Sequence, residues 1–139
     1  LLRAAGPEVL TDEKIRHVAI ANPALAPYGA AARQVLARLG LAEVLAGKLV
    51  MGQNVGEAYS MIATGNAEAG FVALASVHAA PAPLRGSHWA VPATLHDPIR
   101  QDAVLLSHGA GNAAARAFLD YLRTPAARDL MQRYGYRTE

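Results

Sequence analysis

Hydrophobic residues gather in five short runs along the chain, separated by polar or turn-forming residues. These runs, predicted to be strands, are "HVAIA" (17–21), "KLVMG" (48–52), "AGFVALA" (69–75), "HWAVPA" (88–93) and "AVLLSH" (103–108). Between the first three, apolar residues recur with helical period over residues 28–39 and 55–64, and Gly65 follows as a helix-ending residue. Strands and helices that alternate in this way are typical of an α/β protein with a parallel sheet covered on both faces.

The C-terminal part of the chain has a different pattern, "NAAARAFLDYLRTPAARDLMQRYGY". Asn112 is a suitable N-cap for one helix, and Thr124 followed by Pro125 is a suitable start for a second, which Gly135 would end. At the other end, the sequence begins with a short helical stretch and no strand before it. Because the two terminal helices then have few strands to cover, we expect that part of a domain precedes residue 1.

Composition excludes several function classes. Hydrophobic residues make up 53% of the 139 residues and charged residues only 17%, as in a folded domain and unlike a disordered segment. The formal net charge is +2 and the basic residues are scattered, which argues against a nucleic-acid partner. The chain has no cysteine, hence no disulfide and no thiolate metal site, and no apolar run long enough for a membrane span.

The sequence also lacks the usual signatures of enzymes. The five histidines have no metal-ligand spacing, and neither a G-x-S-x-G elbow nor a P-loop is present. The first strand is not followed by G-x-G-x-x-G, which argues against a dinucleotide cofactor. The acidic residues lie mostly on the polar faces of predicted helices. We therefore expect no enzymatic activity and no cofactor.

Two strand-to-helix junctions remain, "ANPALAPYGAAA" and "VMGQNVGEAYS". In an open parallel sheet, ligands bind beyond the carboxyl ends of the strands, where helix N-termini present N–H groups and a positive dipole end. Gly29 and Gly56 would leave room for a ligand near the backbone, and Asn54 with Glu57 forms a predicted capping box. The junctions therefore suit an anion, although ordinary capped helices explain the same spacing.

These junctions also carry a family resemblance. The motifs "ANPALAPYG", "GQNV", "TGNAEAGFVA" and "YGY" follow one another in order across residues 17–136. Together they resemble the periplasmic molybdate-binding proteins of bacterial molybdate ABC transporters. The resemblance implies a type II periplasmic-binding-protein fold of two lobes that close on a tetrahedral oxyanion, molybdate or tungstate.

The resemblance also implies the site residues. Backbone N–H groups at Tyr28 and Val55 would bind the oxyanion, the only metal species expected, with Pro27, Gly29, Asn54 and Ala73 in support. Ala73 stands where some family members carry a ligand-binding tyrosine, so that contact should be missing. The two hydroxyl-bearing loops of the first lobe would lie in roughly the first two fifths of the family's chain, which this sequence does not contain.

The resemblance implies a domain organisation as well. Residues 1–14 would be a remnant of the first lobe, residues 15–88 the complete second lobe, and residues 89–139 the returning C-terminal part of the first lobe. We expect a periplasmic protein that delivers its ligand to a membrane permease, and a homodimer formed through the exposed surface of the incomplete lobe. The alternatives are an effector-binding lobe of a cytosolic transcription regulator, or a binding protein for another oxyanion such as sulfate.

Overall fold

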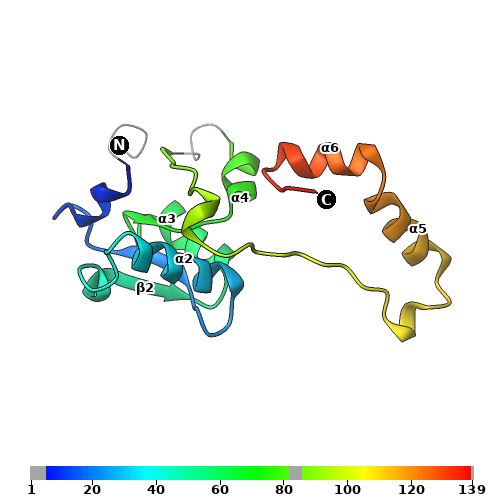
Figure 1. Ribbon diagram of the computed structural model, residues 1–139, viewed down its shortest axis with the longest axis horizontal. Coiled ribbons are helices and arrows are strands. Elements are labelled where there is room, and N and C mark those ends of the chain that lie inside the picture. Colours follow the sequence, from blue (N-terminus) through cyan, green and yellow to red (C-terminus); the bar gives the residue numbers. More distant parts are fainter. Residues whose placement is uncertain (1–5, 82–85, 139) are drawn as a thin grey trace. The chain divides into compact units, whose positions relative to one another are not determined.

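A computed structural model describes residues 6–81 and 86–138 of the protein (Figure 1). The chain divides into two compact units, the first ending at Ile99 and the second beginning at Arg100. The helices and strands of the first unit are η1 (Gly6–Thr11), β1 (Val18–Ala21), α2 (Pro27–Arg38), η2 (Ala46–Lys48), β2 (Leu49–Gly52), α3 (Val55–Ala63), β3 (Ala69–Gly70), α4 (Leu74–Ala79) and η4 (Ala93–Leu95). Those of the second unit are η5 (Ser107–Gly109), α5 (Ala113–Leu122) and α6 (Pro125–Arg133).

The first unit is built on a parallel sheet with the strand order β2-β1-β3. In the register of the strands, Val18 pairs with both Leu49 and Ala69, so β1 has a neighbour on each side. All four residues of β1 are buried, as expected for a central strand covered on both faces. The predicted β-α-β-α-β arrangement is therefore confirmed.

Helices α2 and α3 cover opposite faces of the sheet. On one face, Val18 packs in a cluster with Leu36 of α2 and Leu45. On the other, the next residue Ala19 packs with Ala58 of α3. Because successive residues of a strand point to opposite faces, the two helices must lie on different sides of β1.

Three strand predictions need correction. The run over residues 69–75 is a strand only at Ala69–Gly70, and its later residues enter helix α4. A short apolar run does not distinguish a strand from a buried helix, and the alanines of this run suit a helix. The runs over residues 88–93 and 103–108 form no strand. A strand needs a hydrogen-bonded neighbour, and the sheet formed by the described residues comprises β1, β2 and β3.

The predicted helix starts and ends of the second unit are confirmed. The Asn112 side chain accepts hydrogen bonds from the N–H groups of Ala114 and Ala115, and Thr124 caps α6 in the same way through Ala127. Pro125 is the first residue of α6, and Gly135 has a φ of 86° after its end. The expected division into lobes at residues 14 and 88 stays a prediction.

Candidate functional site

The carboxyl ends of β1 and β2 are neighbours at one edge of the sheet. Ala21 pairs with Gly52, and the N–H of Asn22 donates a hydrogen bond of 2.7 Å to the carbonyl oxygen of Gly52. The loop that leads to α2 and the loop that leads to α3 therefore leave the sheet side by side. Both helices begin at this edge, which is the ligand-binding edge of open parallel sheets.

Asn22 shapes the loop between β1 and α2. Its side-chain oxygen accepts from the N–H of Ala24 at 2.9 Å, and its carbonyl oxygen accepts from the N–H groups of Leu25 and Ala26. These bonds turn the chain from the strand into the helix within five residues. Sequence reasoning passed over this residue, although an asparagine directly after a predicted strand is a recognisable turn signal.

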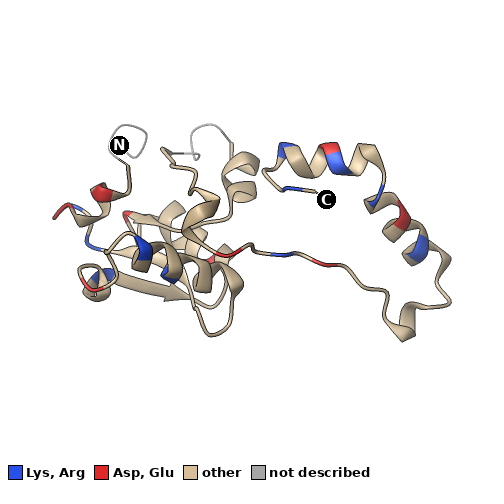
Figure 2. Cartoon of the chain, in the orientation of Figure 1, with Lys and Arg blue, Asp and Glu red and all other residues tan. Residues whose placement is uncertain are grey.

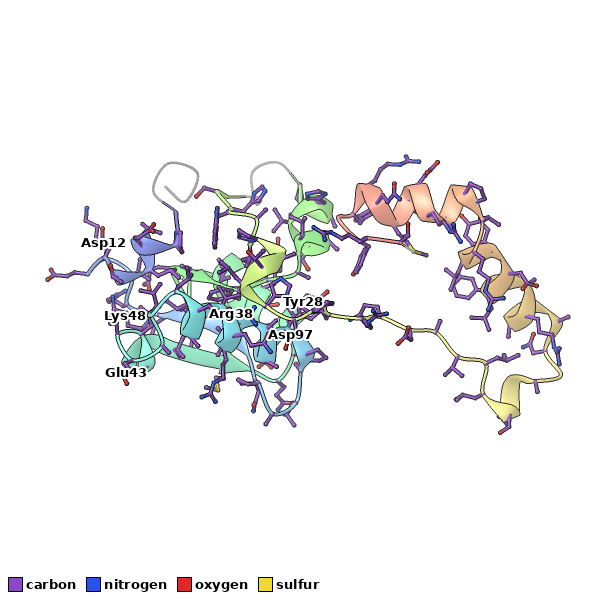
Figure 3. All side chains as sticks on the ribbon, in the orientation of Figure 1. Asp12, Tyr28, Arg38, Glu43, Lys48 and Asp97 are labelled. Atoms are coloured by element: carbon purple, nitrogen blue, oxygen red, sulfur yellow. The ribbon has the colours of Figure 1, made fainter. Side chains whose placement is uncertain are left out.

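The start of α2 carries three of the predicted site residues. Pro27 is the first helical residue, and Tyr28 follows as the second; the ring of Tyr28 is labelled in Figure 3. The preceding residue, Ala26, has an extended backbone and provides no side-chain cap. The positive end of the α2 dipole at this edge of the sheet is therefore not met by a capping side chain from the N-cap position.

Gly29 has a packing role that the sequence did not indicate. A Cβ atom at this position would collide with the carbonyl oxygen of Ala21 and would lie 2.8 Å from the carbonyl carbons of Ala21 and Asn22. The helix thus rests directly on the end of β1, and only a glycine permits this approach. The space that we assigned to a ligand at Gly29 is occupied by the strand end.

The start of α3 has the predicted N-cap, Asn54, but differs in one bond from a capping box, in which the Glu57 carboxylate would accept from the N–H of Asn54 itself. Asn54 accepts from the N–H of Glu57 at 3.0 Å, and the Glu57 carboxylate accepts from the N–H of Gln53 at 2.7 Å. Val55 is the first helical residue, and within the described part of the chain its N–H donates no hydrogen bond. The first turn of α3 therefore has a fixed geometry with a backbone donor to spare.

Ala73 lies beyond the carboxyl end of β3, the third strand of the same parallel sheet. It is the N-cap residue of α4 and is only 8% exposed. The structure thus brings the predicted residues of the α2 start, the α3 start and Ala73 to the same edge of one sheet. Their contacts with a ligand stay a prediction.

Figure 2 marks the formally charged residues, of which only Glu57 belongs to residues 22–32 and 53–60, where the two helices start. At the opposite edge, the Glu68 carboxylate accepts the N–H groups of His17 and Arg16 at 2.8 and 3.0 Å and pairs with the Arg16 guanidinium at 3.3 Å. The hydrogen bond from the His17 N–H is the main cause that lowers the pKa of Glu68, and the bonds from Arg16 act in the same direction. This cluster joins the beginnings of β1 and β3, which suits a structural role.

Residues 6–81 and 86–138 support neither a metal site built from side chains nor a membrane-spanning helix. They contain no group of three or more His, Cys, Asp or Glu side chains arranged to hold a metal ion. None of their helices is long and apolar enough to cross a membrane.

An open parallel sheet with two helix starts at the carboxyl ends of neighbouring strands is the arrangement at which α/β proteins commonly bind ligands. The comparison with protein families makes the class specific. Residues 3–137 match the family described as bacterial extracellular solute-binding protein, and the chain belongs to this family.

Two relatives are named molybdate-binding protein. The chain is 52% identical over 128 residues to the one from Azotobacter vinelandii, covering 92% of this chain and 51% of that protein. It is also 52% identical over 134 residues to the one from Rhodobacter capsulatus, covering 96% of this chain and 51% of that protein. The chain therefore spans about half the length of these relatives.

Solved structures agree with the fold. The periplasmic molybdate-binding protein of Azotobacter vinelandii aligns with a TM-score of 0.86 at 41% identity, over 95% of this chain and 58% of that one. A substrate-binding domain of a putative molybdenum ABC transporter from Clostridium difficile aligns with a TM-score of 0.72 at 24% identity, over 96% of this chain and 58% of that one, and supports the fold alone. The predicted α/β fold of a periplasmic binding protein is thereby confirmed.

Proposed function

We propose that this protein is a periplasmic solute-binding component that binds molybdate or tungstate and delivers it to the permease of an ABC transporter. The observation that carries the proposal is the pair of helix starts at one sheet edge, in a chain 52% identical to proteins named for molybdate binding. The protein is proposed to bind and release its ligand unchanged, without enzymatic activity and without a cofactor.

The chemistry of the ligand suits this edge. Molybdate is a dianion at neutral pH, so a protein that recognises it needs donors and no acceptor. Backbone N–H groups at Tyr28 and Val55 supply such donors without a buried lysine or arginine, which would be costly while the site is empty. A protonated phosphate would need an acceptor at the site, and sulfate is smaller than molybdate, so discrimination would come from the lack of an acceptor and from the size of the closed site.

Val55→Pro tests the backbone-donor model with little risk to the fold. Proline is well accepted at the first position of a helix, and Asn54 before it already has an extended backbone, with φ −144° and ψ 173°. The substitution removes one N–H from the site. We expect about a tenfold or larger loss of molybdate affinity, as for a hydrogen bond to a charged partner.

The measurement is a titration of the 139-residue chain with sodium molybdate, followed through backbone amide chemical shifts, which detect weak binding. Calorimetry on the same chain should show no submicromolar binding, because a second set of donors lies outside this sequence in the proposal. An unchanged molybdate affinity in Val55→Pro would contradict the donor role of the Val55 N–H. Submicromolar molybdate binding by the unsubstituted 139-residue chain would contradict the proposal that further donors are needed.

We further propose that the isolated chain forms a homodimer through the apolar surface of the second unit. The exposed large hydrophobic residues of this unit are Val104, Leu106, Phe118, Tyr121, Leu130, Tyr134 and Tyr136. Among the described residues of this unit, only Ala127 is a buried hydrophobic residue. An uncovered apolar surface of this kind favours association. A monomer by light scattering that also binds no hydrophobic dye would contradict the dimer.

A further inference from the structure

Glu57 presents a contradiction at the proposed oxyanion site. It is the only residue with a formal charge in the two junctions, residues 22–32 and 53–60, and its charge is negative. A carboxylate beside a site for a dianion opposes binding, so its presence requires a physical explanation.

The Glu57 side chain is held over the end of β2. Its carboxylate accepts from the N–H of Gln53 at 2.7 Å, and a Cβ atom at Gly52 would lie 2.9 Å from the Cβ of Glu57. Gly52 is the residue whose carbonyl oxygen accepts from Asn22. Glu57 therefore packs on the point where the two junctions are joined.

The hydrogen bonds around Glu57 also decide which backbone donors stay available. The N–H of Gln53 is taken by the Glu57 carboxylate, that of Glu57 by the Asn54 side chain, and that of Ala58 by the Asn54 carbonyl oxygen. Within the described residues, the N–H groups of Val55 and Gly56 donate no hydrogen bond. Among the described residues the N–H of Asn54 donates none either, so three consecutive donors remain at the start of α3.

We propose that Glu57 is a positioning residue of the oxyanion site with two opposed effects. Its acceptor oxygens fix the loop so that the Val55 and Gly56 N–H groups point to the ligand, and its charge weakens the binding of a dianion. The inference rests on the proposed function. A binding protein that must release its ligand to a permease benefits from a moderate affinity. The Glu57 charge lowers the affinity for the dianion without removing a hydrogen-bond donor.

Two substitutions separate these effects. Glu57→Gln keeps an acceptor oxygen for the Gln53 N–H but removes the charge, whereas Glu57→Ala removes both. The matched control is Glu43→Gln, which changes the net charge equally; Glu43 lies in the turn before β2, at the far side of the unit from Tyr28 (Figure 3).

The experiment is the sodium molybdate titration of the chain and its variants, followed by amide shifts at low and at high salt. At low salt we expect Glu57→Gln to bind about three- to tenfold more tightly than the unsubstituted chain. The gain should fall below about twofold near 1 M salt, where charges are screened within about 3 Å. We expect Glu57→Ala to bind about three- to tenfold more weakly than Glu57→Gln, because the loop loses an acceptor, and Glu43→Gln to stay within about twofold of the unsubstituted chain.

Equal affinities of Glu57→Gln and Glu43→Gln at low salt would overturn the charge effect, and equal affinities of Glu57→Ala and Glu57→Gln would overturn the positioning effect. Hydrogen exchange of the Gln53 amide without ligand distinguishes these results from a failure of the proposed function. Protection should persist in Glu57→Gln and be lost in Glu57→Ala. If molybdate causes no saturable change in the amide chemical shifts of Tyr28 or Val55 in the unsubstituted chain, the proposed function is contradicted, and the charge effect with it.

Discussion

The two units of the chain differ in how they bury their hydrophobic residues. The first unit encloses Val18, Ile20, Val35, Leu36 and Leu45, each at most 1% exposed. In the second unit, α5 and α6 have equally clear caps, yet Phe118 is 59% exposed and Val104 77%. Caps and local periodicity are thus sufficient to define a helix, whereas a core needs other elements to pack against.

The largest effect that separates the units is expected from Gly29→Ala. The added Cβ would collide with the backbone of Ala21 at the end of the central strand, and backbone atoms there have no room to yield. We expect a loss of about 3 kcal/mol or more in the unfolding free energy of the first unit. Urea denaturation followed by amide signals of β1 measures it.

Gly47→Ala is the matched control for this substitution. A Cβ at Gly47 would meet no atom within 4 Å. Its unfolding free energy should stay within about 0.5 kcal/mol of the unsubstituted chain. Similar stabilities of the two variants would contradict the close contact between α2 and β1.

A second comparison truncates one large side chain in each unit. Leu36→Ala opens a cavity next to Val18 and should cost about 2–5 kcal/mol. Phe118→Ala, made in dilute and monomeric protein, should change the stability by no more than about 0.5 kcal/mol, because the ring is largely in solvent. At high concentration the same variant should dimerise less by light scattering, and a large destabilisation in the dilute protein would show that Phe118 belongs to a core.

The smallest effect is expected from Glu68→Gln and depends on pH. Because hydrogen bonds lower the pKa of the folded-state carboxyl, its contribution to stability is present above the unfolded-state pKa and is lost as the pH falls through the lowered value. Thermal midpoints measured from neutral pH to below about pH 4 should therefore converge between the variant and the unsubstituted chain. A difference that is independent of pH would exclude this cause.

Periodicity and caps predicted much of the first unit. The alternation of apolar runs with helical segments predicted the succession of strands and helices along the chain from β1 to β3, and Asn54 was correctly predicted as the N-cap of α3. The Glu57 carboxylate accepts from the N–H of Gln53 instead of the Asn54 N–H expected of a capping box. These features depend on residues a few positions apart, which is the range over which a sequence pattern carries structural information.

The features missed by sequence reasoning depend on distant residues. The hydrogen bond from Asn22 to Gly52 exists because β1 and β2 are neighbours in the sheet. The requirement for a glycine at position 29 follows from the contact of α2 with the backbone of Ala21, which the sequence does not reveal. The false strands at residues 88–93 and 103–108 have the same origin, since an apolar run becomes a strand only beside another strand. Residues 74–75 were predicted as strand although they begin α4, because a short apolar run does not distinguish a strand from a helix.

The contacts between α2 and the segment around η4 also join residues that lie far apart in the sequence. The Gln34 side chain and Asp97 exchange two hydrogen bonds of 2.7 Å. Arg38 donates to the carbonyl oxygen of Thr94 at 2.9 Å and pairs with Asp97 at 3.5 Å; Arg38 and Asp97 are labelled in Figure 3. These contacts fasten the segment around η4 to α2. No local pattern in residues 93–97 indicated that this segment belongs to the first unit.

The hydrogen bond from Asn22 to the carbonyl oxygen of Gly52 has a consequence for engineering the proposed binding edge. Since one bond of 2.7 Å joins the two loops, a shift in either loop displaces the other. The effects of substitutions in residues 22–28 and 52–57 should therefore not add, and a double-mutant cycle across them should give a coupling energy above the roughly 0.5 kcal/mol seen for independent positions. In the proposed site, a change of ligand preference would have to be selected in both loops together.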